Sequence, residues 1–263
     1  MLMYPLHYRF LPGIPESANF WISICWQKPF PRVDDGAPDL QAALAMVEIA
    51  AESGVSAITV TPHSNMPGYF ENHWGPELRQ KVEDFISALR WAGAAVSLYT
   101  GMEIFGTPDT PALLRQGRLM TLNGSRYPLI EFPFEGYAAQ ATDILRRVAA
   151  LGYRPVVAHP ERYRYAQEDP ALLDRWLGLG CLLQVNRGSL FGRFGRASEA
   201  LAHGMLRRGQ VSVVASDAHS PATRTPWLRD AWELICKEYS AGTARLLLED
   251  NPRRILADQA PVP

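Results

Sequence analysis

Histidines, glutamates and an aspartate recur directly after short apolar runs of this 263-residue chain. Residues 155–158, for example, form an apolar run that is followed by His159. Four to six apolar residues between turn signals are typical of a buried parallel strand. The carboxyl ends of such strands carry the chemistry of α/β folds. Seven metal-binding side chains are predicted at strand ends: His7, His63, Glu103, Glu131, His159, Asp217 and His219.

These side chains offer nitrogen and oxygen ligands without a thiolate, a set that suits manganese, iron, zinc or magnesium. Asp35, which precedes a predicted helix, is expected on the same face. Asp217 and His219 are two residues apart, so an extended backbone would point both side chains the same way. One such histidine could simply pack or cap a strand, but the collection on one face favours a metal cluster. Two or three ions would share a carboxylate, with Glu103 as the candidate.

Such a cluster would hold a hydroxide, because a bound metal ion lowers the pKa of water from about 15.7 to near 7. Arg162 and Arg224 add planar guanidinium groups that match phosphate oxygens. The alternative for either arginine is an ion pair at the surface, for instance between Arg162 and Glu161. Metal ions with converging arginines predict hydrolysis of a phosphate ester by in-line attack of the metal-bound hydroxide.

Predicted strands alternate with amphipathic helices, which favours a (β/α) barrel of about seven strands in a single domain. A doubly wound open sheet is the alternative. The predicted strands lie at 1–11, 55–60, 96–100, 127–130, 155–158, 181–185 and 211–215. Helices are predicted from Asp34-Asp35 to Gly54, at 75–91, briefly after Pro111, and at 137–151, 169–179, 195–208, 226–239 and 241–249.

Residues 15–33 interrupt this alternation with an aromatic-rich segment between prolines. Unstructured loops of this length are uncommon in compact domains unless they form lids or are disordered. The run from Phe20 to Trp26 has the composition of a strand. A lid, an extra strand and an ill-fitting insertion all remain possible.

Composition limits the classes of function. The net charge of −1 gives no overall field that favours nucleic acid or anionic membranes. The apolar runs fall short of the roughly 18 residues that a membrane helix needs, so membrane insertion is not expected. Residues 1–11 contain a histidine and an arginine, unlike a signal peptide. Three scattered cysteines fit a cytoplasmic protein.

A cysteine-based tyrosine phosphatase is set aside because that chemistry needs a thiolate close before an arginine in a phosphate-binding loop. Cys181 precedes Arg187, but the residues between them have the pattern of a buried strand. The loop with Arg193 and Arg196 is the one feature that suggests nucleic-acid binding, and it is better suited to an acidic protein tail.

The chain resembles the polymerase-and-histidinol-phosphatase (PHP) superfamily, most closely its tyrosine-phosphatase branch of bacterial capsular and exopolysaccharide synthesis. The motifs that carry this resemblance are DDGA (34–37), TPH (61–63), GMEI (101–104), LIEFP (129–133), HPER (159–162), NRGSLFGRFG (186–195) and SDAH (216–219). The resemblance implies a distorted seven-stranded barrel and a site for three metal ions, often manganese. It also implies removal of phosphate from phosphotyrosine, usually on the autophosphorylated kinase of polysaccharide export.

Residue roles follow from the same resemblance. One ion would be held by Glu103 and Asp217 with His7, the second by Glu103, Glu131 and His159, and the third by Asp35, His63 and His219. Arg162 and Arg224 would bind the phosphate. Oligomerisation is left open.

The start of the chain departs from the family pattern, an Asp-x-His-x-His strand that runs directly into Pro-Gly-x-Asp-Asp-Gly. The aligned residues are Pro5-Leu6-His7-Tyr8-Arg9, so an arginine takes the place of one histidine ligand. Residues 15–33 then separate Pro12-Gly13 from Asp34-Asp35. Two alternatives to the tyrosine phosphatase therefore remain: a phosphatase for a small metabolite such as histidinol phosphate, and a degenerate member that binds without catalysis.

Overall fold

The structure is a computed structural model that describes residues 20–24, 37 and 39–262. The predicted strand at 1–11 and the candidate residues His7, Arg9 and Asp35 lie outside the described residues. Within residues 15–33, the structure describes strand β1 (Phe20–Ile24). Of the three possibilities for this segment, a strand is therefore observed for part of it.

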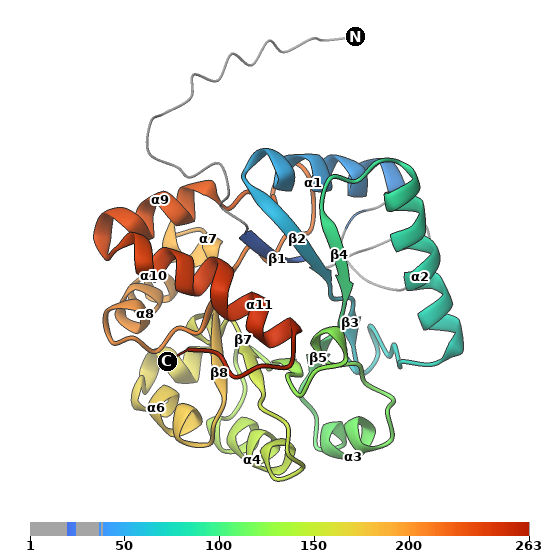
Figure 1. Cartoon of the computed structure of the whole chain (residues 1–263). Helices are drawn as coiled ribbons and strands as arrows, with labels where there is room; N and C mark the ends of the chain where they lie inside the picture. Colours follow the sequence, from blue (N-terminus) through green and yellow to red (C-terminus); the bar gives the residue numbers. More distant parts are fainter. Residues whose placement is uncertain (1–19, 25–36, 38, 263) are drawn as a thin grey trace.

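Parallel strands form two hydrogen-bonded groups whose order follows the chain (Figure 1). The first group is β1, β2 (Val55–Val60) and β4 (Ser97–Thr100). The second is β3 (His63–Ser64), β5 (Glu103–Phe105), β6 (Leu129–Glu131), β7 (Val156–Ala158), β8 (Leu182–Asn186) and β9 (Val213–Ala215).

Two strands each run through both groups, with a short break in the middle. The proline of Thr61-Pro62 separates β2 from β3, and Gly101-Met102 separates β4 from β5. The backbone pairing continues across the breaks, since the Gly101 amide donates to the Val60 carbonyl at 2.9 Å. Seven strand positions therefore follow one another in chain order, and β1 comes into contact with β9 at the far end. This order confirms the distorted seven-stranded barrel, because a doubly wound sheet would reverse its strand order part-way.

Helices follow most strands and cover the outside of the sheet (Figure 1). They are α1 (Leu40–Glu52), α2 (Pro76–Trp91), α3 (Thr110–Arg115), α4 (Ala138–Ala149), α5 (Arg164–Glu168), α6 (Ala171–Gly178), α7 (Arg187–Leu190), α8 (Arg196–Arg207), α9 (Arg229–Glu238), α10 (Ala241–Arg245) and α11 (Asn251–Leu256). Short 3₁₀ turns occur at η1 (Leu122–Gly124) and η2 (Pro160–Arg162), and a π-helical turn η3 (Leu246–Asp250) joins α10 to α11. No described helix has the length and apolar character needed to cross a bilayer.

Helix α1 shows how the sequence sets one boundary. The helix was expected to start near Asp34-Asp35, but the described helix begins at Leu40 because Asp39 caps it, accepting a hydrogen bond from the Ala42 amide at 2.8 Å. Gly54, with φ of 94°, follows its last turn, as expected for a glycine in the left-handed region after a helix.

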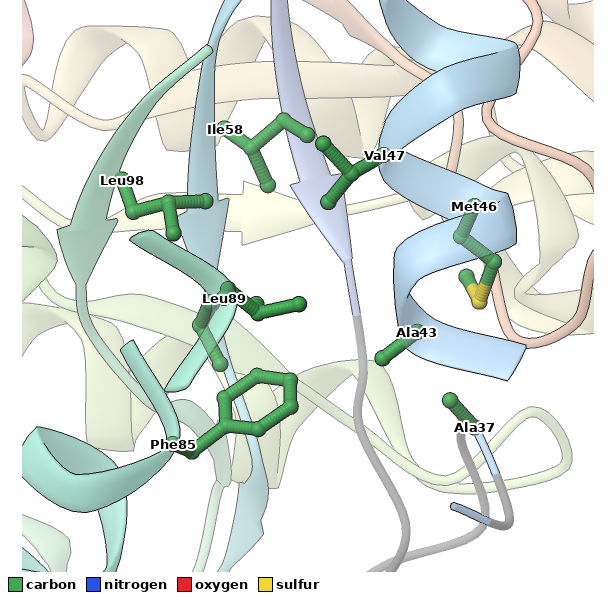
Figure 2. A pocket seen from close by; sticks show the side chains of 9 residues that line it. Ala37, Ala43, Met46, Val47, Ile58, Phe85, Leu89 and Leu98 are labelled. Atoms are coloured by element: carbon green, nitrogen blue, oxygen red, sulfur yellow. The ribbon is translucent and has the colours of Figure 1, made fainter. Parts of the chain in front are cut away.

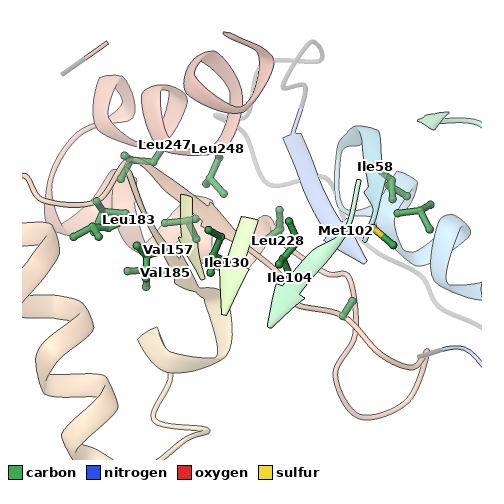
Figure 3. Packing of buried hydrophobic residues seen from close by; sticks show 14 of the residues in the cluster. Ile58, Met102, Ile104, Ile130, Val157, Leu183, Val185, Leu228, Leu247 and Leu248 are labelled. Atoms are coloured by element: carbon green, nitrogen blue, oxygen red, sulfur yellow. The ribbon is translucent and has the colours of Figure 1, made fainter. Parts of the chain in front are cut away.

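One continuous apolar cluster fills the space between strands and helices (Figure 3). Val157 and Leu183 of the barrel strands belong to it, together with Leu248 of the π-helical turn, and all three are fully buried. A cavity of about 20 Å³ remains between β2, β4, α1 and α2, lined by Met46, Phe85 and other apolar side chains (Figure 2). It offers no polar partner to a ligand, so we regard it as a packing gap.

Candidate metal centre and phosphate site

Six of the predicted ligands lie in the described part of the chain, and all six are buried; two begin the short strands β3 and β5, one ends β6, and three follow β7 and β9. They are His63, Glu103, Glu131, His159, Asp217 and His219. The backbone pairing contributes directly, because His63 on β3 is the register partner of Glu103 on β5. Their roles as metal ligands stay a prediction.

Glu103 and Glu131 lie between two histidines. His159 Nε2 is 3.2 Å from Glu103 Oε1 and 3.4 Å from Glu131 Oε1. On the other side, His63 Nε2 is 3.5 Å from Glu103 Oε2 and 3.9 Å from Glu131 Oε2. Each carboxylate thus directs one oxygen towards each imidazole. This is the arrangement of groups that could bridge two cations.

The three most tightly clustered groups fit a divalent ion. Ligand atoms of Glu103, Glu131 and His159 all lie within 4.8 Å of one another. Among the described residues, the buried Nδ1 atom of His159 has no hydrogen-bond partner. Two adjacent buried carboxylates and a neutral imidazole form a nitrogen and oxygen set that suits a divalent transition metal or magnesium.

The charges in this cluster perturb one another. Burial, together with the charge of Glu103, raises the pKa of Glu131 to about 7. Burial alone would lower the pKa of His159, but its hydrogen bond with Glu103 and the charge of Glu131 raise it above its usual value. A bound cation would relieve the repulsion between the two carboxylates.

The backbone is strained at two of the candidate ligands. His159 has φ of 32° and Asp217 has φ of 51°, in the left-handed region that side-chain-bearing residues rarely occupy. Such strain clusters at functional sites. The extended backbone expected from Asp217 to His219 is therefore not observed, but the two side chains do lie close, with His219 Nδ1 3.7 Å from Asp217 Oδ1. His219 Nδ1 also lies 3.1 Å from the Asp217 carbonyl oxygen, and the His219 ring lies 6.0 Å from that of His63.

Both predicted phosphate-binding arginines reach the carboxylate of Asp217. Arg162 Nη1 lies 3.5 Å from Asp217 Oδ2, and Arg224 Nη2 donates to the same oxygen. Arg224 also donates from Nε to the Asp217 carbonyl at 3.2 Å. The alternative pairing of Arg162 with Glu161 is not what the described contacts show. Glu161 is fully buried and accepts hydrogen bonds from the Ser189 hydroxyl at 2.6 Å and the Asn186 amide at 3.0 Å.

Sequence reasoning assigned no role of its own to Asn186 in the site. Its Nδ2 donates to Asp217 Oδ2 at 2.6 Å, and its Oδ1 accepts from Gln184 Nε2 at 2.7 Å. Asn186 is the last residue of β8, and Gln184 is a buried polar residue within that strand. The rule that predicted the candidate ligands, a polar residue at a strand's carboxyl end, also applies to Asn186.

The sequence predicted residues 1–11 as the first strand, whereas the first described strand, which pairs with β2, is β1. Its five residues, Phe-Trp-Ile-Ser-Ile, include no histidine, aspartate or glutamate. Ile24 is the register partner of Val60, so β1 ends level with the strand that leads to His63. The strand seen beside β2 therefore offers no imidazole or carboxylate ligand. The ligand roles of His7 and Asp35 stay predictions.

The structure gives a physical reason to set cysteine chemistry aside at Cys181. Burial raises the pKa of this thiol to about 12, so the nucleophilic thiolate is scarce at neutral pH. Cys236, also described, has its pKa raised by burial too. Neither thiol has the low pKa that a cysteine-based phosphatase requires of its nucleophile.

Comparison with known proteins finds sequence agreement over most of the chain. The tyrosine-protein phosphatase YwqE of Bacillus subtilis is 31% identical over 229 residues, covering 87% of this chain and 89% of that protein. The tyrosine-protein phosphatase CpsB of Streptococcus pneumoniae is 34% identical over 236 residues, covering 86% of this chain and 95% of that protein.

Solved structures extend the agreement to three dimensions. Crystal structures of YwqE and CpsB are described as those of unique metal-dependent tyrosine phosphatases. One of these chains superposes with a TM-score of 0.82 at 29% identity, covering 92% of this chain and 96% of that one. A lactonase from Listeria monocytogenes, 12% identical with a TM-score of 0.57, shares the fold.

A family model, described as "Capsular polysaccharide synthesis, CpsB/CapC", matches residues 28–257. This range contains every described residue of the candidate site and leaves out β1. The chain belongs to the CpsB/CapC family.

Proposed function

We propose that this protein is a metal-dependent phosphatase that removes phosphate from phosphotyrosine in a protein substrate. The observation that carries the proposal is the adjacency of two sites. A buried cluster of Glu103, Glu131 and His159 that suits a cation lies beside two arginines that converge on Asp217. A bound cation neutralises the charge of a phosphate monoester, and a fork of N–H donors orients it.

Glu103, Glu131, His159 and His63 would hold the metal, with Asp217 and His219 completing the ligand set. Divalent ions bound there would activate water and stabilise negative charge on the phosphate. Manganese is the ion we propose, as the sequence resemblance implies, with iron, zinc and magnesium as alternatives of similar ligand preference.

The arginines would bind and orient the phosphate. In the structure their N–H groups are directed at the carboxylate of Asp217. A phosphate dianion offers the same kind of acceptor with more charge, so it would replace Asp217 as their partner. Asn186 would keep its hydrogen bond to Asp217 and hold that carboxylate towards the metal cluster.

The relatives are named tyrosine-protein phosphatases, and the family model is described by capsular polysaccharide synthesis, so we propose protein phosphotyrosine as the class of substrate here. The specific partner we propose is the tyrosine kinase of polysaccharide export, acted on in the cytoplasm. Arg193, in the loop before α8, and Arg196, the first residue of α8, would meet its acidic tail. We further propose that the chain forms one catalytic domain, with residues 15–33 as an insertion.

The test is release of phosphate from a phosphotyrosine peptide by the full chain after incubation with Mn²⁺. Turnover should need the metal and stop with a chelator. His159→Ala should abolish it, while His203→Ala, a histidine that pairs with Glu238 away from the cluster, should leave it intact. Absence of metal-stimulated turnover in the unsubstituted protein would refute the proposal.

One observation favours a second candidate, a family member that binds without catalysis. The strand beside β2 is Phe20–Ile24, which carries no histidine, aspartate or glutamate. Elemental analysis of the metal-loaded protein separates the two. Less than one ion per chain would favour the binding protein, and two or more would favour the phosphatase.

A further inference from the structure

Two phenylalanines enclose one of the arginines at the rim of the site. The Arg162 guanidinium carbon lies 4.3 Å from the centre of the Phe134 ring and 4.2 Å from the centre of the Phe194 ring. The same Phe194 ring lies 5.9 Å from the guanidinium carbon of Arg224. Aromatic rings thus lie against the guanidinium groups of both arginines.

We propose that Phe134 and Phe194 select aryl phosphates, by packing against the phenyl ring of the substrate while the arginines hold its phosphate. The proposal rests on the proposed function and names the structural basis of its preference for tyrosine. Aromatic rings that cover the faces of a guanidinium leave only its N–H edge open, so an anion would bind at that edge. A phosphate bound at that edge would hold its ester group beside the two rings.

Phe134 is well placed for this role because its ring is both anchored and accessible. It packs against His159, with ring centres 5.8 Å apart, and against Tyr163 at 6.2 Å. Its carbonyl accepts a hydrogen bond from the Arg164 amide at 2.8 Å, which fixes the backbone. Phe134 nevertheless remains 39% exposed, so part of its ring is open to a ligand.

The position of Phe194 depends on a glycine. A Cβ atom added to Gly188 would lie 2.8 Å from Phe194 Cε2, too close for ordinary contact. Gly188 is part of α7 and has no left-handed backbone that would itself demand glycine. The absence of a side chain at this position therefore lets Phe194 pack closely against the backbone, over Arg162.

A phenyl ring offers these two residues something that an alkyl group does not. Aromatic pairs in offset or edge-to-face geometry add binding beyond the burial of apolar area, equivalent to a preference of roughly 3- to 10-fold per ring. A phosphoserine ester has no ring to place there. The arrangement would therefore discriminate by the leaving group while the arginines treat every phosphate alike.

The experiment measures binding of phenylphosphonate and methylphosphonate, which are not hydrolysed, to the Mn²⁺-loaded full chain by calorimetry. We expect the phenyl compound to bind at least about 3-fold more tightly. Phe194→Leu and Gly188→Ala should each reduce this preference several-fold, whereas Gly178→Ala should preserve it. An added Cβ at Gly178, in α6, meets nothing within 4 Å.

Equal binding of the two phosphonates, or binding of neither, would overturn the proposal. It would also fail if the variants weakened both compounds equally, since the rings would then only hold Arg162 in place. Turnover of phosphotyrosine and phosphoserine peptides separates this result from the proposed function. Metal-dependent turnover without an aryl preference rejects the aromatic selection alone, and an aryl preference in binding without turnover rejects the catalytic function alone.

Discussion

The carboxylates of Glu103 and Glu131 lie side by side between the imidazoles of His63 and His159. Both acids are buried, and they come from neighbouring strands, β5 and β6. Burial and the charge of its neighbour raise the pKa of Glu131 to about 7. The metal-free protein therefore retains a proton in this cluster near neutral pH, and several measurable consequences follow from it.

Metal binding should release a proton near neutral pH. A cation stabilises the ionised form of Glu131, so the proton held below pH 7 must leave as the metal enters. The apparent affinity for Mn²⁺ should rise from pH 5.5 to pH 7.5 and then level off. Titration calorimetry in two buffers of different ionisation enthalpy measures the proton count. No buffer dependence at pH 6.5 would contradict the protonated cluster.

The metal-free protein should lose stability as pH rises from about 5 to 8. Glu131 has a folded-state pKa near 7 and an ordinary value of 4.5, so the folded chain binds the extra proton between them. The raised pKa of His159 acts in the same direction, because its protonated form is favoured by folding and that contribution is lost as pH rises through the folded pKa. The expected fall in unfolding free energy is of the order of 1–3 kcal/mol. Urea denaturation with a chelator present measures it, and a rise over this range would refute it.

Replacing either convergent arginine should reduce kcat/KM for an aryl phosphate by about 10- to 100-fold, because the free energy of a lost hydrogen bond to a charged group corresponds to a factor of this size. Arg162→Lys and Arg224→Lys keep the charge but lose the planar fork. Arg164→Lys is the control, because that side chain is exposed and pairs with Glu168. Steady-state kinetics on all three variants make the comparison. An equal loss in the control would show that the effect is not local.

Asn186→Ala should weaken metal binding by about 10- to 100-fold, as expected when the partner of a metal ligand is removed. The substitution removes the donor 2.6 Å from Asp217 Oδ2, so that carboxylate would no longer be held in one orientation. Asn123→Ala, which removes a donor to the Leu256 carbonyl in another part of the fold, is the control. Metal content after dialysis at fixed free Mn²⁺ provides the readout. Unchanged content in Asn186→Ala would exclude this positioning role.

Gly106→Ala should destabilise the fold by about 1–3 kcal/mol, the usual cost of overpacking. The added Cβ would lie 2.3 Å from Phe132 Cε1, and this phenylalanine is buried in the core. Phe132→Leu in the same chain should recover part of the loss by making room. Thermal unfolding of the single and double variants tests this, with Gly178→Ala as the control. Equal midpoints for both glycine variants would show that Phe132 moves aside at no cost.

Local patterns predicted much of the architecture. The strand expected at 55–60 is observed at Val55–Val60, and the helix expected at 75–91 is observed at Pro76–Trp91. Apolar periodicity is sufficient there because each element buries one face or both, and burial dominates the choice of residues. The rule that parallel strands end on one face also predicted the six described candidate ligands as one group, and all six are buried.

Long-range packing decided what the patterns left open. Sequence could not choose the strand that lies beside β2, because residues 1–11 and 20–24 both have strand character, and only pairing with Val55–Val60 distinguishes them. It could not foresee the left-handed backbone at His159 and Asp217, which the surrounding fold imposes against local preference. Nor could the sequence predict that Phe134 and Phe194 both contact the guanidinium of Arg162, since these two loops lie 60 residues apart along the chain. The sequence by itself determined which chemical groups reach the mouth of the barrel. The tertiary structure decided how these groups face one another, because packing, and not spacing along the chain, sets the distance and orientation between separate strands.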